Sequence, residues 1–109
     1  MRFSLRIICS SSAAEIIAPK AKEMLRDFHL SDDITFSPYW KDDQCMILEL
    51  HTEIAHPDYR KIRQHVLAIS GADALSESDS PDDWECACFA PPTELHSGQN
   101  KAFVVCNIF

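Results

Sequence analysis

The first residues of the chain alternate between apolar and polar side chains, and this alternation constrains the fold more than any other feature. A period of two is the spacing of a β-strand that buries one face and leaves the other in water. Residues 2–9 therefore predict a strand in a sheet with one buried face. The inward set is Phe3, Leu5, Ile7 and Cys9, and the outward set is Arg2, Ser4 and Arg6.

The next segment changes to the period of an α-helix. Ser12 and Glu15 stand at the spacing of a capping box, which predicts that a helix opens there. Pro19 interrupts the segment, so the helix is either kinked at this residue or begins late, near Ala18. The apolar stripe consists of Ile17, Ala21, Met24 and Phe28.

A second helix is predicted after His56–Pro57, with Pro57 as its first residue and Asp58 favourable to the helix dipole. Gly71 is placed to end this helix in the left-handed conformation. The buried stripe is formed by Tyr59, Ile62, Val66 and Ile69.

Four further segments predict strands, at residues 34–40, 45–52, 84–89 and 101–108. Pro38 assigns the first of them to a sheet edge, because proline has no N–H to donate to a central ladder. Residues 41–44 form a polar turn of hairpin length, and residues 71–83 and 90–100 predict loops. In the segment 45–52 the inward residues are Met46, Leu48 and Leu50, and the outward ones are Ile47, Glu49 and His51.

The order of these elements predicts an α+β fold for one domain spanning residues 1–109. It matches the β-α-β-β-α-β order of a ferredoxin-like sandwich, with one extra C-terminal strand. Two helices would cover one face of an antiparallel sheet and leave the other face open. This fold serves many unrelated functions, so it does not select one.

Five cysteines lie in apolar, strand-like surroundings, at positions 9, 45, 86, 88 and 106. Their odd number and irregular spacing argue against structural disulfides and predict a reducing, cytoplasmic compartment. Cys86 and Cys88 would share one face of a strand, but no second Cys or His pair stands at the spacing of a zinc site. We therefore expect no metal or cofactor, and we interpret the thiols as small buried hydrophobes.

Negative charge is concentrated in one part of the chain. The formal net charge is −7, and residues 64–100 contain no Lys or Arg. A field of one sign repels nucleic acid and anionic membranes and attracts basic surfaces. We therefore expect a basic protein partner, no nucleic acid and no membrane. The acids of this window are Asp73, Glu77, Asp79, Asp82, Asp83, Glu85 and Glu94.

Tryptophans accompany the carboxylates at two places, which is the composition of an interface anchor with a charged rim. Trp84 stands beside Asp82, Asp83 and Glu85, and Trp40 stands near Asp42 and Asp43. Core packing is the alternative interpretation for each tryptophan. The predicted partner-binding residues are Asp73, Glu77, Asp79, Asp82, Asp83, Trp84, Glu85, Trp40, Asp42 and Asp43.

In its small size, acidity, α+β layout and Asp/Glu/Trp clusters, the chain resembles the immunity proteins of bacterial toxin systems, including contact-dependent growth inhibition. The resemblance implies a cytoplasmic inhibitor that binds and neutralises a cognate toxin domain, often a nuclease. Carboxylates and an aromatic plug would occlude the basic cleft of the toxin. The resemblance carries no defining motif, so it implies no catalytic residue.

Two other functions remain open from the sequence. One is a small enzyme that uses the open sheet face, with Glu49 and His51 as acid–base groups. The other is a regulatory module that forms a dimer by pairing sheet edges. We expect the inhibitor, which is not an enzyme, ahead of both alternatives.

Overall fold

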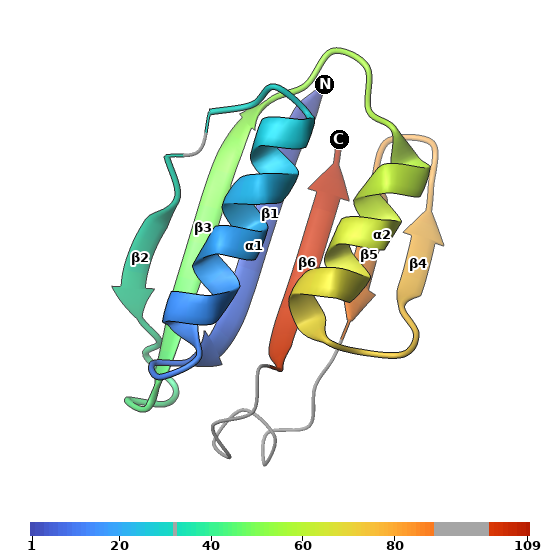
Figure 1. The fold of residues 1–109 in the computed structure, drawn as a ribbon. Helices are drawn as coiled ribbons and strands as arrows, with labels where there is room; N and C mark the ends of the chain where they lie inside the picture. The colour runs from blue at the N-terminus through green and yellow to red at the C-terminus, as the bar shows by residue number, and fades with distance from the viewer. Residues whose placement is uncertain (32, 89–100) are drawn as a thin grey trace.

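The computed structural model describes residues 1–31, 33–88 and 101–109. It is an α+β structure in which two helices lie on one face of a six-stranded antiparallel sheet (Figure 1). In chain order the elements are β1 (Arg2–Ser10), α1 (Ala14–Asp27), β2 (Thr35–Pro38), β3 (Cys45–Glu53), α2 (Tyr59–Ser70), β4 (Ser76–Asp79), β5 (Trp84–Cys88) and β6 (Ala102–Ile108). Among the described residues, no helix is long and apolar enough to cross a membrane.

The strand order across the sheet is β2-β3-β1-β6-β5-β4. This order corrects the prediction of one extra strand at the C-terminal end. The C-terminal strand β6 lies directly beside β1, where Leu5 pairs with Cys106, and the added strands β5 and β4 lie outside it. The apolar inward face of residues 102–108 explains this central position, because β6 is buried at every second residue.

The strand β4 replaces part of the loop that was predicted for residues 71–83. Its four residues are all exposed, and they pair with β5 from Ser76 opposite Ala87 to Asp79 opposite Trp84. The segment lacks the β-branched and aromatic residues that indicate a strand. It is extended because its backbone completes the ladder to β5.

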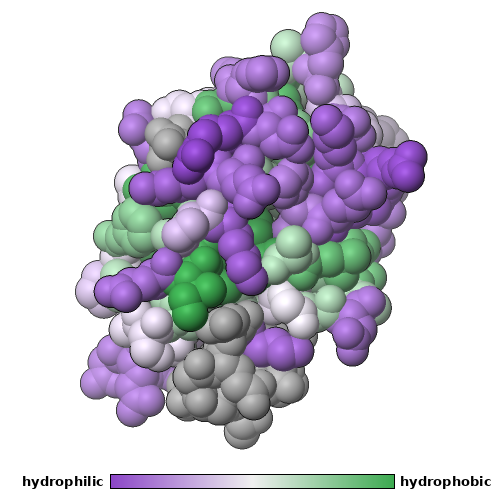
Figure 2. All heavy atoms as spheres, viewed as in Figure 1, coloured by the Kyte–Doolittle hydropathy of each residue, from purple (hydrophilic) through white to green (hydrophobic). Residues whose placement is uncertain are grey.

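The helices bury the stripes that the sequence predicts. Ile17, Ala21 and Met24 of α1 are buried, as are Ile62 and Val66 of α2. They pack on the inward residues of β1, β3, β5 and β6 to form the core. On the helix face, hydrophilic residues cover the upper part and hydrophobic surface gathers lower down, near the start of α1 and the end of α2 (Figure 2).

The helix ends differ from the predictions in their details. The helix α1 begins at Ala14 and runs through Pro19, so the late start near Ala18 is wrong. No side chain of the predicted capping box caps α1; instead, the Ser10 hydroxyl accepts a hydrogen bond of 3.1 Å from the Ala13 N–H. The same N–H also bonds to the Ser10 carbonyl at 3.0 Å, so Ser10, at the end of β1, fixes the residue before the helix through its side chain and its backbone.

In α2 the N-cap is Asp58, and Pro57 therefore lies before the helix rather than at its first position. The Asp58 side chain accepts a hydrogen bond of 3.2 Å from the Lys61 N–H. At the other end Gly71 adopts φ 70°, as predicted, and its N–H bonds to the Leu67 carbonyl at 3.0 Å. A left-handed residue is tolerated there because glycine has no Cβ.

Candidate protein-binding site

Three carboxylates of the acidic window gather at the turn between β4 and β5. Ser80 and Asp83 close this turn through two backbone hydrogen bonds of 2.8 and 3.3 Å. Pro81 occupies the second position of the four-residue turn, which its fixed φ favours. Asp79, Asp82 and Asp83 are exposed on the turn and at its entrance. We call these three residues, with Ser80 and Pro81, the acidic hairpin.

A hollow of about 350 Å³ lies against the acidic hairpin. Its walls combine the three carboxylates with apolar groups that come from both ends of the chain. In Figure 1 the two chain ends lie near one another at the same end of the sheet as the hairpin. The lining residues are Met1, Tyr59, Asp79, Ser80, Pro81, Asp82, Asp83, Trp84, Ile108 and Phe109.

Trp84 lines this hollow from within the core and does not project from the surface. Its side chain is only 5% exposed, and its ring meets Tyr59 in an edge arrangement with 4.9 Å between ring centroids. The indole N–H donates a hydrogen bond of 2.8 Å to Glu77 Oε2. The core interpretation of Trp84 therefore describes its position, and the residue supports the hairpin.

Glu77 is fully engaged with its neighbours. The same Oε2 atom that accepts from Trp84 also lies 2.7 Å from Arg63 Nε of α2. Hydrogen bonds from Arg63 and Trp84, with the Arg63 charge, lower the pKa of Glu77. Glu77 thus joins β4 to α2 and to the core. The carboxylates of the acidic hairpin, which follows Glu77 in the chain, are exposed to solvent.

The other predicted acids of this window lie apart from the hairpin. Glu85 points to the opposite sheet face, where it accepts a hydrogen bond of 3.1 Å from the Asn107 amide. Asp73 is exposed in the connection between α2 and β4. Glu94 lies outside the described residues.

The second acidic cluster is at the other end of the sheet, in the turn between β2 and β3 (Figure 1). Phe3 of β1 is level with Ile108 and so with the acidic hairpin, whereas Ser10 is level with Cys45. Seven residues of strand separate these two levels, which corresponds to roughly 23 Å. Trp40, Asp42 and Asp43 therefore cannot surround the same point of a partner as the hairpin.

Within this second cluster Trp40 is the most exposed large hydrophobic residue among those described, at 79%. The Lys41 ammonium lies 4.9 Å from its ring centroid, in cation–π geometry. Asp42 Oδ1 accepts a hydrogen bond of 3.0 Å from the Gln44 N–H and so shapes the turn. Asp43 is exposed beside it.

Several acids in the rest of the chain face cations. Glu53 pairs with Arg2 and the N-terminal ammonium, Glu49 with Arg6 and His51, and Asp27 with Lys61 and His65. Across residues 1–31, 33–88 and 101–109, no cation lies within 4 Å of the carboxylates of Asp79, Asp82 or Asp83. The acidic hairpin thus holds three neighbouring carboxylates that face solvent, and among the described residues exposed acids such as Glu23 and Asp73 also have no cation within 4 Å.

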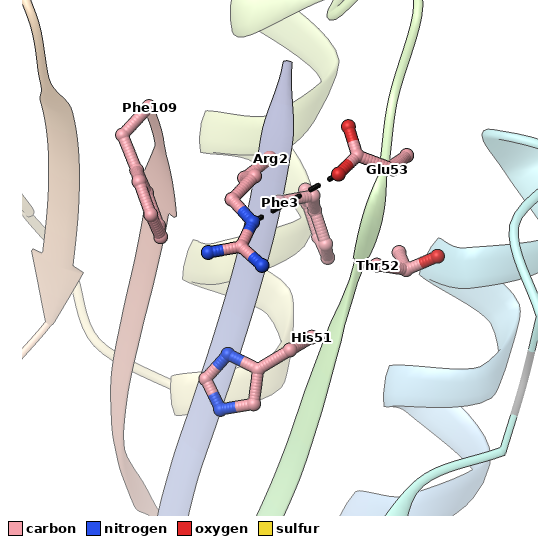
Figure 3. Close-up of a pocket in the computed structure, with 6 residues that line it drawn as sticks. All are labelled: Arg2, Phe3, His51, Thr52, Glu53 and Phe109. Carbon is pink, nitrogen blue, oxygen red and sulfur yellow. Dashed lines mark ion pairs between the residues drawn. The ribbon is translucent and has the colours of Figure 1, made fainter.

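Glu49 and His51 lie side by side on the open sheet face, with 3.4 Å between His51 Nε2 and Glu49 Oε2. Arg6 Nε reaches the other oxygen of Glu49 at 3.4 Å. His51 also lines a hollow of about 370 Å³ at the end of this face, where Arg2 lies between His51 and Phe109 (Figure 3). Arg2 pairs there with Glu53 at 3.8 Å, so the face carries an array of solvated ion pairs.

The open sheet face also carries a groove that the sequence analysis did not find. Two adjoining hollows of about 370 and 390 Å³ share Arg6, Ile8 and Tyr39. Phe103 and Val105 line one of them, and Trp40 lines the other. The apolar residue Ile8, which breaks the alternation of the first strand, is the signal from which an apolar patch on this face could have been predicted.

All five cysteines are buried and free. Burial is the main cause that raises the pKa of Cys9 to about 11 and that of Cys86 to about 11. Cys86 and Cys88 point into the core, and the described part of the chain contains no group of three or more side chains suited to a metal ion.

No protein-family model, curated protein or solved structure matches this chain. The candidate site therefore depends on its own geometry: three unneutralised carboxylates on a hairpin, beside a hollow lined with aromatic residues.

Proposed function

We propose that this chain is an inhibitor-type binding protein that docks the acidic hairpin on a basic protein surface. One observation carries the proposal: Asp79, Asp82 and Asp83 face no cation among the described residues and border a hollow with apolar walls. Carboxylates left to solvent in this way are available for a partner. An apolar hollow beside them offers surface that association would remove from water.

The two parts of the site have different tasks in this proposal. The carboxylates attract the partner over distance, raise the association rate and disfavour acidic competitors. Tyr59 and Phe109, at the hollow, provide apolar contact once the partner is seated. Trp84, held by Glu77 and Tyr59, keeps the floor of the hollow in place. Salt is therefore expected to slow association more than it speeds dissociation.

The partner class that we propose is the toxin domain of a bacterial contact-dependent or related toxin system, and a nuclease in particular. A nuclease cleft is basic because it binds phosphates, so it complements the acidic hairpin. In this proposal the chain acts in the cytoplasm as the immunity protein, is not an enzyme, and works by occluding that cleft. Support comes from the charge pattern, the size and the free thiols.

A survival assay tests this proposal. Cells express the C-terminal domain of a large secreted effector encoded next to this chain, together with wild-type chain or with Asp82→Lys/Asp83→Lys. We expect the wild-type chain to restore growth and the double reversal to lose protection while remaining folded. Asp43→Lys, in the acidic cluster at the other end of the sheet, is a charge-reversal control and should still protect. Equal protection by the double reversal would refute the acidic hairpin as the site.

A second candidate function is a dimer formed through the β2 side of the sheet. Phe36 on this edge strand is 48% exposed and Trp40 in the turn after it is 79% exposed, which are large apolar groups for a monomer surface. Mass measurement in solution at increasing concentration tests it. A dimer that Phe36→Ser/Trp40→Ser converts to a monomer would support this function, whereas a monomer throughout would exclude it.

We also propose an interpretation of the fold. Without β4 and β5, the order β2-β3-β1-β6 and the connections through α1 and α2 correspond to a ferredoxin-like unit. The β4–β5 hairpin is then an insertion before the last strand, which widens the sheet. In this interpretation the acidic hairpin belongs to the inserted element and not to the shared scaffold.

A further inference from the structure

The strand β4 is the edge strand of the sheet on the side of the acidic window. Its outer edge carries backbone N–H and C=O groups that do not pair with β5. In the described part of the chain β4 pairs with β5 alone. Ser80 and Asp83 form a hydrogen-bonded pair, and hydrogen-bonded and non-hydrogen-bonded pairs alternate along an antiparallel ladder. The backbone N–H and C=O groups of Glu77 and Asp79 therefore point away from β5, toward the outer edge.

The two edge strands, β2 and β4, differ in the backbone N–H donors that they present outward. On β2 the outward positions are Phe36 and Pro38, because Tyr39 bonds to Cys45 and the same alternation applies. Pro38 has no N–H, so the β2 edge is blocked at one of its two outward positions. On β4 neither Glu77 nor Asp79 is a proline, and both can donate and accept.

The side chains on β4 determine which strand this edge accepts. Glu77 and Asp79 lie on the helix side of β4, with Ser76 and Ser78 on the other side. A second copy of β4 would bring carboxylates against carboxylates, and like charges on facing strands are unfavourable. A strand with Lys or Arg at alternate positions would instead place its cations beside Asp79 and the Glu77–Arg63 pair. Acidic side chains thus oppose self-pairing and favour a basic strand.

We propose that the free edge of β4 is a docking edge for an extended, basic segment of the partner protein, which adds to the sheet as a seventh, antiparallel strand. The inference rests on the proposed function, because it specifies how the basic partner engages the acidic side of the molecule. Main-chain bonds to Glu77 and Asp79 supply the register, and Asp79 with the acidic hairpin supplies the charge selection. Small side chains of the added strand face Ser76 and Ser78.

A peptide titration followed by NMR tests the docking edge. The probe is a short capped peptide in which Lys and Thr alternate, and the matched control carries N-methyl groups on its Lys residues. The control keeps the charge but has lost the N–H groups that would pair with Glu77 and Asp79. We expect saturable binding of the probe, slower hydrogen exchange at the Glu77 and Asp79 amides, and affinity lowered about tenfold by N-methylation.

Two variants separate the edge from the charge. In Asp79→Pro the outward N–H is removed together with the carboxylate while every bond from β4 to β5 is kept, so the affinity for the probe should fall about tenfold below that of Asp79→Asn. Asp79→Asn keeps that N–H and loses only the charge, so it should weaken binding less and reduce its salt dependence. The amide spectrum of each variant establishes that the sheet is intact.

Other results would overturn the inference. If the probe and the N-methylated control bind equally and shift the amide signals of residues 80–83 only, the β4 edge is not used. Docking through the carboxylates of the acidic hairpin would remain consistent with that result. No binding of the probe at millimolar concentration would also exclude the edge, and the survival assay would then judge the proposed function separately. Probe binding at β4 with no neutralisation of any toxin domain would retain the edge and reject the proposed function.

Discussion

The Trp84 indole donates a 2.8 Å hydrogen bond to Glu77, and this contact joins the acidic strand β4 to the core. The two residues belong to neighbouring strands of one hairpin, and Arg63 of α2 holds the same carboxylate oxygen from the helix layer. An acid that the sequence assigns to an interface thus stabilises the element that carries the proposed docking site. The carboxylates left for a partner are those farther along the hairpin.

The two tryptophans should report opposite environments. Trp40→Phe leaves only the buried Trp84, so emission should move to shorter wavelength and acrylamide should quench it weakly. Trp84→Phe leaves only the exposed Trp40, which should emit at longer wavelength and be quenched strongly. Steady-state fluorescence measures both. Strong quenching of Trp84 in the folded Trp40→Phe protein would contradict its place in the core.

The first helix should depend on Ser10 and not on Ser12. Ser10→Ala removes the side-chain acceptor for the Ala13 N–H but keeps the Ser10 carbonyl that accepts from it at 3.0 Å, so it should lower the free energy of unfolding by about 0.5–1 kcal/mol. Ser12→Ala, two residues along, should change it by less than about 0.5 kcal/mol. Urea unfolding of both variants provides the comparison. A larger loss of unfolding free energy in Ser12→Ala than in Ser10→Ala would show that Ser12 caps the helix after all.

The contact between α1 and α2 should make stability depend on pH in the acid range. A hydrogen bond from His65, together with the charges of Lys61 and His65, lowers the pKa of Asp27. A carboxyl with a lowered pKa in the folded state stabilises the protein above its unfolded pKa, about 3.9, and loses this effect as pH falls through the lower folded value.

Asp27→Asn should therefore have a lower Tm than wild type near neutral pH, and the two Tm values should converge below about pH 3.9. Glu23→Gln is the control on the same helix, since Glu23 is exposed. Thermal melts across acid pH measure the difference. A Tm gap for Asp27→Asn that is constant across this range would exclude the titration of Asp27 as its cause.

The buried thiols should be chemically inert in the folded protein. Because burial raises the pKa of Cys9 and Cys86 to about 11, little reactive thiolate exists near neutral pH. An aromatic disulfide reagent should label all five cysteines in concentrated urea and label them only slowly without it. Rapid labelling under native conditions would show that the strands carrying the thiols open readily.

Periodicity predicted the central elements of the fold because the core enforces it. The alternation of β1 and the stripes of α1 and α2 are confirmed, and so is the edge position of β2 that Pro38 predicted. The strand β4 was missed because its residues are polar and exposed, so only pairing with β5 makes the segment extended. Its hydrogen-bonding partners lie across the hairpin, and no local pattern encodes them.

The candidate site was predictable in its charge but not in its shape. The absence of Lys and Arg from residues 64–100 predicts an acidic side from the sequence alone. The hollow requires Phe109 and Tyr59 beside the hairpin, and these residues are far apart in sequence until the sheet order brings them together. The separation of Trp40 from Trp84 likewise follows from the direction of the strands. Amino-acid composition does not predict that direction.

Calorimetric titration tests the proposed docking most directly, with the chain titrated at low and high salt with the C-terminal domain of a secreted effector encoded next to it, the proposed partner. We expect tight binding that weakens strongly with salt and is lost in Asp82→Lys/Asp83→Lys but retained in Asp43→Lys. Binding that is insensitive to salt and to the double reversal, or no binding to that domain, would contradict the claim that the acidic hairpin is the docking site.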